Sequence, residues 1–280
     1  MSLQLFDGKK IWINFISYAD RLFSGGRNDL WSNPDTFISV YSQGQGLIRS
    51  DVLGIPIGEV YGHFLKRDKE IYKAWVGRKP TYALKKLLAL EEPKNYVKEV
   101  LSGLQNLYQE SLPVALVLPS PETWVHMIHE KVNPGEELDM TDRLVEAASM
   151  YLAELLRSFS TYGLSAIVIK EESSSMQRIS LYEPLINVSR HYKWVVGLEL
   201  PGVDNELEEQ SERIDFYLIR ECSLQSIQSF DGKNVIIGGG LNTNFWTKNE
   251  LVDEVPKTLI YGEIPKYAQP ESVLSQLKKL

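Results

Sequence analysis

The sequence predicts a single-domain α/β protein of the (β/α)8 TIM-barrel class, spanning residues 1–280. Short runs rich in Val, Ile and Leu recur eight times, and longer amphipathic segments separate them. Such near-continuous apolar runs are typical of parallel strands that are buried on both faces. Eight strand–helix units in this length match the usual barrel size of ~250 residues. The expected strands are residues 11–17, 52–58, 114–120, 166–171, 194–200, 215–221, 234–240 and 258–264.

The helical pattern in the sequence is less regular in the first half of the chain. Residues 20–45 combine Gly, Ser, Asn and Asp in a pattern that is typical of a loop, and residues 1–45 are the least defined part of the expected barrel. Residues 66–110 predict two or three helices, broken near Pro80 and Pro93, because proline interrupts the helical hydrogen-bond ladder.

The second half contains two clear helical patterns. Residues 141–162 repeat apolar side chains at helical spacing, with Thr141 or Asp142 as the N-cap. Gly163 then suits the left-handed position that follows a helix. Residues 269–280 carry an early proline and late lysines, and they predict a closing helix whose charges complement its dipole.

An open doubly wound sheet is the rival fold. That fold needs a glycine-rich phosphate loop after its first strand, and residues 11–20 (IWINFISYAD) contain no glycine. The glycines of residues 238–242 (GGGLN) come late and lack the G-x-G-x-x-G spacing. The pattern therefore favours the barrel.

Composition and charge exclude several classes of protein. The net charge is −7, from 30 Lys and Arg against 37 Asp and Glu, and no basic cluster offers a face for nucleic acid. The single cysteine, Cys222, excludes an internal disulfide and any multi-cysteine metal site. No apolar run resembles a signal peptide or a membrane span, so we expect a cytoplasmic protein with no membrane association.

The expected active site lies at the carboxyl ends of the strands, where barrel enzymes place their chemistry. Glutamates stand at or near six of the eight strand ends, and such a ring could bind a cation or supply an acid and a base. Glutamate is also common at helix N-termini, so the ring has a purely structural explanation as well. The candidate catalytic residues are Glu171, Glu199 and Glu221, and the candidate substrate-binding residues are Glu59, Ser120, Lys170, Asn242 and Glu263.

The histidines and the cysteine point less clearly to chemistry. His126 and His129 are three residues apart in an amphipathic segment, which favours a pair on a helix surface over a metal site. Cys222 has no histidine near it in the sequence, and we interpret it as a small packing residue. None of these residues is therefore assigned as a metal ligand.

Several strand ends together resemble the cobalamin-independent methionine synthase family. Residues 113–124 (PVALVLPSPETW), a long helix and residues 162–173 (YGLSAIVIKEES) are similar to its Gly-Pro-Tyr-Thr-like turn, long helix and Ile-Gln-Ile-Asp-Glu-Pro strand end. Residues 215–227 (DFYLIRECSLQSI) and residues 54–64 (GIPIGEVYGHF) resemble two further strand ends of the family, and the last strand and helix resemble its closing elements. The resemblance implies a methyltransferase-like barrel connected with methionine biosynthesis, and it raises a pterin-type methyl donor as a cofactor.

The zinc ligands of that family are missing. Its catalytic members bind zinc through His-x-Cys after the fifth strand, a glutamate after the sixth and a cysteine after the eighth. Here the fifth strand end reads GLELPG and the eighth reads YGEIPKY, so only Glu221 corresponds, within one residue. The resemblance therefore implies a chain without zinc, whereas oxygen ligands from Glu199, Glu221 and Glu263 would suit Mg²⁺ or Ca²⁺.

The fourth strand end also departs from the family. Where relatives have Asp-Glu, which can pair with a substrate ammonium group, this chain has Lys170 and Glu171. The exchange turns an attraction of ~1–4 kcal/mol into a repulsion of similar size. Uroporphyrinogen decarboxylases belong to the same superfamily of barrels, but their arginine pattern is absent and the glutamates would repel a polyanionic substrate.

Three hypotheses for function remain open. The first is a divergent or noncatalytic methionine synthase-like barrel that binds a small molecule and acts with a separate catalytic subunit or as a homo-oligomer. The second is a metal-dependent or acid/base lyase or hydrolase that uses the strand-end glutamates. The third is a noncatalytic interaction protein.

Overall fold

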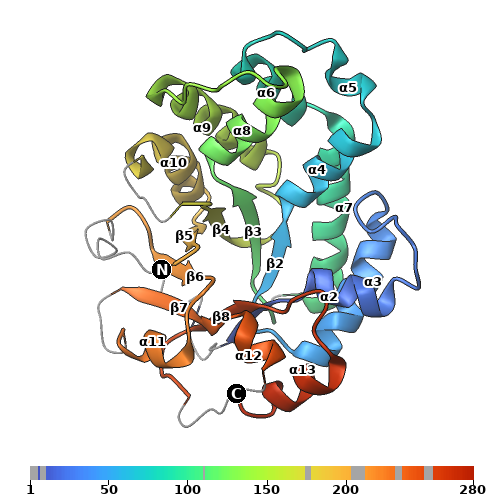
Figure 1. Cartoon of the computed structure of the whole chain (residues 1–280), viewed down its shortest axis with the longest axis vertical. Helices are drawn as coiled ribbons and strands as arrows, with labels where there is room; N and C mark the ends of the chain where they lie inside the picture. The colour runs from blue at the N-terminus through green and yellow to red at the C-terminus, as the bar shows by residue number, and fades with distance from the viewer. Residues whose placement is uncertain are drawn as a thin grey trace.

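Eight parallel strands form a nearly closed barrel in the computed structural model, with helices packed around them (Figure 1). The structure describes residue 6 and residues 11–109, 111–173, 178–202, 212–230, 235–248 and 255–280. The strand order is β1-β8-β7-β6-β5-β4-β3-β2. The predicted (β/α)8 barrel and all eight predicted strands are thereby confirmed. The strands are β1 (Ile11–Asn14), β2 (Leu53–Pro56), β3 (Val114–Pro119), β4 (Leu164–Lys170), β5 (Val195–Leu200), β6 (Phe216–Ile219), β7 (Ile236–Leu241) and β8 (Ile260–Glu263).

In the described residues, helices follow every strand except β5, and they form the outer layer. The larger ones are α2 (Ile16–Phe23), α3 (Pro34–Ile48), α4 (Ile57–Arg67), α6 (Pro80–Leu88), α7 (Glu91–Tyr108), α8 (Pro121–Val132), α9 (Asp142–Arg157), α10 (Glu183–His191) and α13 (Pro270–Leu277). Shorter helices are α5 (Glu70–Lys73), η1 (Ile179–Tyr182), α11 (Leu224–Gln228) and α12 (Thr243–Thr247). None of the helices in the described ranges is long and apolar enough to cross a bilayer.

One prediction for the helices needs correction. The segment expected to be a loop contains most of α3, whose N-cap Asn33 accepts hydrogen bonds from the N–H groups of Asp35 and Thr36. Proline at the first helical position suits the start of α3, because its missing N–H has no partner there anyway. The prediction for residues 66–110 is confirmed, because α5, α6 and α7 are separated near the two prolines. Pro80 begins α6 and Pro93 lies in the first turn of α7, where proline is tolerated.

Side chains that point alternately to the two faces of each strand divide the apolar core into two parts. One apolar cluster fills the inside of the barrel and consists of Trp12, Val52, Ala115, Ala166, Val168, Val195, Phe216, Leu218, Leu259 and Tyr261. A larger cluster lies between the sheet and the helices. Successive side chains of a strand point to opposite faces, so every second residue of each strand faces into the barrel.

The barrel closes between β1 and β2 through side chains. Among the described residues no backbone ladder joins these two strands. Instead, the Ser50 hydroxyl accepts from the N–H of Ile13 at 3.0 Å, and the Asp51 carboxylate accepts from the N–H of Ile11 at 3.0 Å. The N–H of Asp51 donates in return to the carbonyl of Ile11 at 2.8 Å. We call this contact the seam of the barrel.

Candidate functional site

A cluster of four charged side chains lies inside the carboxyl end of the barrel. On β4, Ala166 and Val168 face the interior, so Lys170 is the next inward position. The same alternation carries Glu199 inward on β5 and Glu263 inward on β8. Phe216 and Leu218 face inward on β6, which places Arg220 inward just beyond that strand. We call Lys170, Glu199, Arg220 and Glu263 the mouth cluster.

Glu199 is the centre of this cluster. Its side chain is only 3% exposed, and Lys170 and Glu199 are register partners on neighbouring strands. The Lys170 Nζ atom lies 3.9 Å from Glu199 Oε1, and an Arg220 guanidinium nitrogen lies 3.5 Å from the same oxygen. The buried carboxylate is therefore held between two cations.

Arg220 is fixed by further contacts with the segment that follows β4. Its guanidinium donates to the carbonyl of Glu171 at 2.7 Å and lies 3.8 Å from the carboxylate of Glu172. The Arg220 side chain is 17% exposed and that of Lys170 is 33% exposed. Both cations therefore remain partly accessible to solvent.

Burial and charge act against each other on the two carboxyl groups of the cluster. Burial raises the pKa of Glu199, whereas Lys170 and Arg220 lower it, and Tyr261 donates a hydrogen bond to the carboxylate. Burial also raises the pKa of Glu263, with repulsion from Glu199 and Glu59 adding to it and Lys170 opposing it. The net result is two carboxyl groups that hold a proton more readily than free glutamate does.

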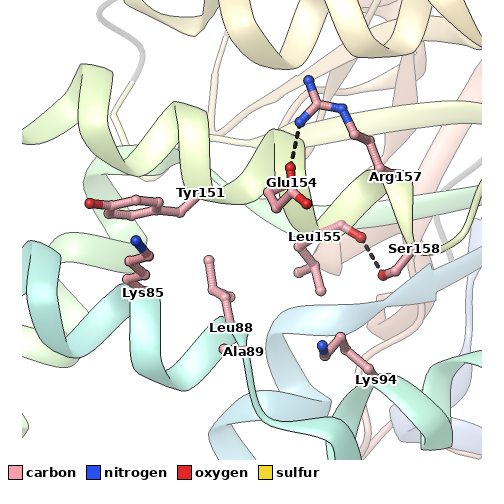
Figure 2. A pocket seen from close by; sticks show the side chains of 9 residues that line it. All are labelled: Lys85, Leu88, Ala89, Lys94, Tyr151, Glu154, Leu155, Arg157 and Ser158. Atoms are coloured by element: carbon pink, nitrogen blue, oxygen red, sulfur yellow. Dashed lines mark hydrogen bonds and ion pairs between the residues drawn. The ribbon is translucent and has the colours of Figure 1, made fainter.

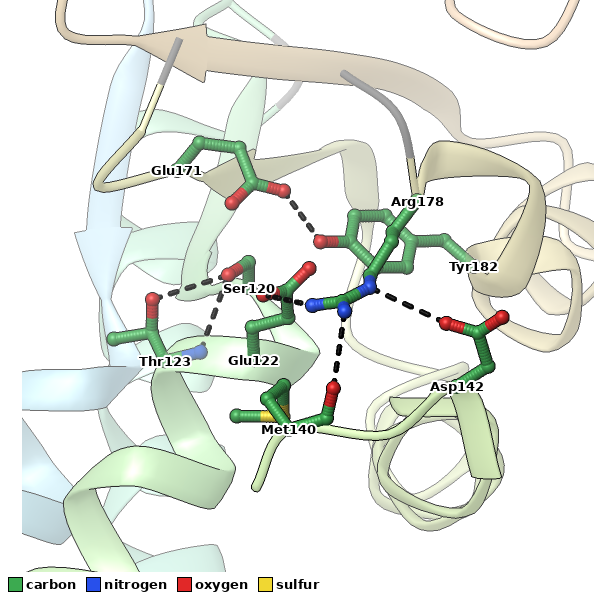
Figure 3. A network of polar contacts seen from close by, with 8 residues as sticks. All are labelled: Ser120, Glu122, Thr123, Met140, Asp142, Glu171, Arg178 and Tyr182. Carbon is green, nitrogen blue, oxygen red and sulfur yellow. Dashed lines mark hydrogen bonds and ion pairs between the residues drawn. The ribbon is translucent and has the colours of Figure 1, made fainter. Parts of the chain in front are cut away.

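Glu171 belongs to a separate polar network outside the barrel wall (Figure 3). Its carboxylate accepts from the hydroxyl of Tyr182 at 2.6 Å, and the residue is 7% exposed. Burial raises the pKa of Glu171 to about 7, and hydrogen bonds from Tyr182 and Ser120 oppose the rise. This carboxyl group therefore changes its charge close to neutral pH.

Arg178 fastens the chain after β4 to the helices below it. Its guanidinium donates to the carboxylate of Glu122 at 3.0 Å and to the carbonyl of Met140 at 3.0 Å, and it lies 3.3 Å from the carboxylate of Asp142. Figure 3 shows these contacts converging on one guanidinium group. Glu122 lies in the first turn of α8 and Asp142 begins α9, so Arg178 links the segment after β4 to both helices. These contacts of Arg178 hold the nearby Tyr182 beside Glu171.

Two of the predicted binding residues are helix caps. The hydroxyl of Ser120 accepts from the N–H of Thr123 and bonds the hydroxyl of the same residue at 3.0 Å, and Ser120 is fully buried at the start of α8. The side chain of Asn242 accepts from the N–H of Phe245 at 3.0 Å and starts α12. Both side chains are thus engaged in satisfying helix N-termini.

The remaining predicted residues lie at the rim. Glu221 is exposed and accepts from the hydroxyl of Thr243 at 3.3 Å, outside the mouth cluster. Glu59 is exposed in the first turn of α4, close enough to Glu263 to raise the pKa of that residue. The structure therefore brings together Lys170, Glu199 and Glu263, with Glu59 beside them.

Sequence reasoning missed Arg220 and Tyr261. Alternation along β6 could have predicted Arg220. Phe216 and Leu218 face into the barrel, so Arg220 is the next inward residue and Glu221 faces outward. Tyr261 precedes Glu263 by two residues, and an aromatic residue is so common in a strand that it does not indicate a functional site.

A transition-metal site does not fit the residues that the structure describes. Within those residues no group of three or more His, Cys, Asp and Glu side chains is placed to hold a metal ion. Burial raises the pKa of the Cys222 thiol to about 11, and its sulfur accepts from the N–H of Gly240 at 3.1 Å. Cys222 is therefore a protonated packing residue at neutral pH, whereas a cysteine binds zinc as its thiolate.

Comparison with known proteins identifies a shared fold. No protein-family model matches the chain, and no curated protein matches it in sequence. A methyltransferase from Methanosarcina mazei is similar in structure, with a TM-score of 0.59 and 10% identity over 97% of this chain and 93% of that one. A B12-independent methionine synthase from Shewanella sp. W3-18-1 in complex with selenomethionine gives a TM-score of 0.47 and 13% identity, over 90% and 88% of the two chains. At 10% identity, the first likeness shows that the two chains share the barrel fold.

Proposed function

We propose that this chain is a methionine synthase-related barrel protein that binds a small carboxylate-bearing molecule at its mouth and does not methylate homocysteine with zinc. The observation that carries the proposal is the mouth cluster, in which Lys170 and Arg220 flank the buried carboxylate of Glu199, with Lys170 in the position where the resembling family has an aspartate. The fold likeness to a methyltransferase and the resemblance of the strand ends support the relationship.

The two cations can attract an anion, because burial raises the pKa of Glu199 and of Glu263 and so weakens the repulsion from their carboxyl groups. Lys170 makes one long contact of 3.9 Å with Glu199 and has three donor hydrogens, so its ammonium group can also bind a ligand carboxylate. Arg220 stands across the same carboxylate and is fixed in place by the Glu171 carbonyl. At 4 Å and an effective dielectric of 20, one such attraction amounts to ~4 kcal/mol before desolvation costs.

Zinc chemistry of the family kind does not fit the same residues. A zinc ion near Glu199 and Glu263 would lie beside an ammonium and a guanidinium group, which repel it. Relatives supply sulfur ligands, whereas Cys222 lies buried with its thiol protonated. We therefore assign the mouth cluster to direct binding of an organic anion.

Succinate and putrescine test this proposal, because they have four-carbon chains of similar length and opposite charge. At a succinate concentration tenfold above its Kd, we expect Tm to rise by about 2–3 °C, whereas putrescine leaves Tm unchanged. Differential scanning fluorimetry measures both. The variant Lys170→Met removes the succinate effect, and Lys69→Met, an exposed lysine beyond α4, retains it. Equal shifts with both compounds, or one equivalent of zinc that is lost in Glu199→Gln, contradict the proposal.

A second candidate is an acid/base enzyme, and the raised pKa values of Glu199 and Glu263 favour it. A carboxyl group that stays protonated closer to neutral pH is a better general acid. If the mouth catalyses hydrolysis or elimination, proton NMR of the protein mixed with a panel of small carboxylates will show turnover. That turnover should be lost in both Glu199→Gln and Glu263→Gln, and turnover that survives both changes removes this candidate.

A further inference from the structure

A second candidate binding site lies on the helical layer, away from the mouth. A hollow of about 430 Å³ is bordered by the ends of α6 and α9 and by the start of α7 (Figure 2). The end of α9 leads into the start of β4, so the hollow lies toward the opposite end of the barrel from the mouth cluster. Its lining consists of Lys85, Leu88, Ala89, Lys94, Tyr151, Glu154, Leu155, Arg157 and Ser158.

The lining combines an apolar wall with three cations. Leu88 and Leu155 face the same space in Figure 2, with Lys94 across from them. The Lys85 Nζ atom lies 5.6 Å from the centroid of the Tyr151 ring, so the aromatic face already attracts a cation. With Lys85, Lys94 and Arg157 against the single carboxylate of Glu154, the hollow is positive on a chain whose net charge is −7.

Both cations at the ends of the hollow can accept a further anion. Arg157 contacts Glu154 at 2.5 Å as an exposed pair three residues apart on α9, and such pairs contribute less than about 1 kcal/mol. An anion entering the hollow can therefore replace Glu154 at little cost. Lys94 contacts the exposed carboxylate of Glu91 at 2.5 Å, and its ammonium group has three donor hydrogens, so it can bind an anion beside Glu91.

Helix dipoles explain two of the cations but not the third. Lys85 and Arg157 lie in the last turns of α6 and α9, where the dipole favours positive charge. Lys94 lies in the first turn of α7, where the dipole disfavours a cation, and its side chain is only 16% exposed. The ion pair with Glu91 offsets part of this cost, and a mostly buried ammonium group on the wall of a hollow also suits an anion bound there.

We propose that this hollow binds a small amphiphilic organic anion, with its flat apolar body against Leu88, Leu155 and Tyr151 and its acidic group at Lys94 and Arg157. The volume falls within the range of small-molecule sites, about 300–1,000 Å³. Apolar walls with a few charged groups are the usual composition of such sites. This inference is independent of the mouth cluster.

Two fluorescent probes test the proposal directly. 8-Anilinonaphthalene-1-sulfonate carries the apolar body and the anionic group, and N-phenyl-1-naphthylamine has the same ring system without the sulfonate. Fluorescence titration of the folded protein should show that the sulfonate binds more tightly. Lys94→Gln and Arg157→Gln should each weaken sulfonate binding about tenfold, as expected for losing a charged hydrogen bond. Both variants should leave the neutral probe within about twofold.

Three controls separate this site from nonspecific binding. Ala89→Phe, an exposed position on the lining, should block both probes by filling the hollow. Arg143→Gln removes an exposed cation at the far end of α9 and should change neither probe, and Lys170→Met at the mouth should also have no effect. Near-ultraviolet circular dichroism verifies that each variant is folded. Equal affinity for the two probes, or equal weakening by Arg143→Gln and Lys94→Gln, overturns the proposal.

Discussion

At the scale of single residues, Glu171 makes the stability of the protein depend on pH. Burial raises its folded pKa to about 7, whereas an unfolded glutamate titrates near 4.5. Between these two values the folded state holds a proton that the unfolded state has released. The contribution of Glu171 to the free energy of unfolding is therefore fully present below pH 4.5. It falls as the pH rises toward 7, by about 3 kcal/mol at most.

Glu171→Gln should remove this fall, because glutamine stays neutral and can still accept from Tyr182. We expect the variant to gain stability relative to the wild type between pH 5 and pH 8. Urea unfolding at several pH values measures the difference, which also cancels the contributions of Glu199 and Glu263. Glu172→Gln is the matched control, since Glu172 is exposed. Parallel stability curves for the wild type and Glu171→Gln would refute the assignment.

The sequence predicts the mouth cluster only partly, for a reason that lies at this same scale. The sequence predicts three members of the cluster, because a polar residue at the end of a buried apolar run marks the carboxyl end of a strand. These members are Lys170, Glu199 and Glu263. Predicting Arg220 would have required knowing which residues of β6 face into the barrel. The resemblance aligns this strand only to within one residue, and a shift of one residue moves a side chain to the opposite face of the sheet.

At the scale of elements, α3 shows how tertiary packing overrides local pattern. Its sequence contains two glycines, Gly44 and Gly46, which lower helix propensity, and most of the helix lies in residues 20–45, whose Gly, Ser, Asn and Asp resemble a loop. A Cβ atom on Gly44 would lie 2.7 Å from the ring of Phe15 and 2.8 Å from the side chain of Ala19. Gly44 therefore permits the close approach of α2 and α3, which no local pattern reveals.

The two glycines provide a matched pair of substitutions. Gly44→Ala should destabilise the protein by about 1–3 kcal/mol, because overpacking against Phe15 exceeds the gain in helix propensity. Gly46→Ala meets nothing within 4 Å and should stabilise it by about 0.5–1 kcal/mol. Chemical denaturation measures both. If the two substitutions changed stability in the same direction, the packing explanation for Gly44 would be wrong.

At the scale of the whole molecule, the barrel is a ring of seven backbone ladders and one seam. Eight apolar runs were sufficient to predict the ring, because parallel strands buried on both faces are almost always covered by helices. The seam could not be predicted, since it depends on which side chains reach the free N–H groups of β1. Ser50 and Asp51 have this role, and in the sequence they are merely polar residues before a strand.

The seam should be the point at which the barrel opens most easily, and Ser50 controls it. The Ser50 side chain is 1% exposed, accepts from the N–H of Ile13 and donates to the carbonyl of Val52 at 2.8 Å. Ser50→Ala leaves the Ile13 N–H buried without this partner, which costs about 1–3 kcal/mol. Native-state hydrogen exchange should then quicken first at the amides of β1, before those of β4 and β5, which have ladders on both sides. Ser39→Ala, at an exposed position of α3, should leave exchange unchanged. Equal acceleration in β1 and β5 would instead mean that the barrel unfolds as one unit, with the seam as strong as any ladder.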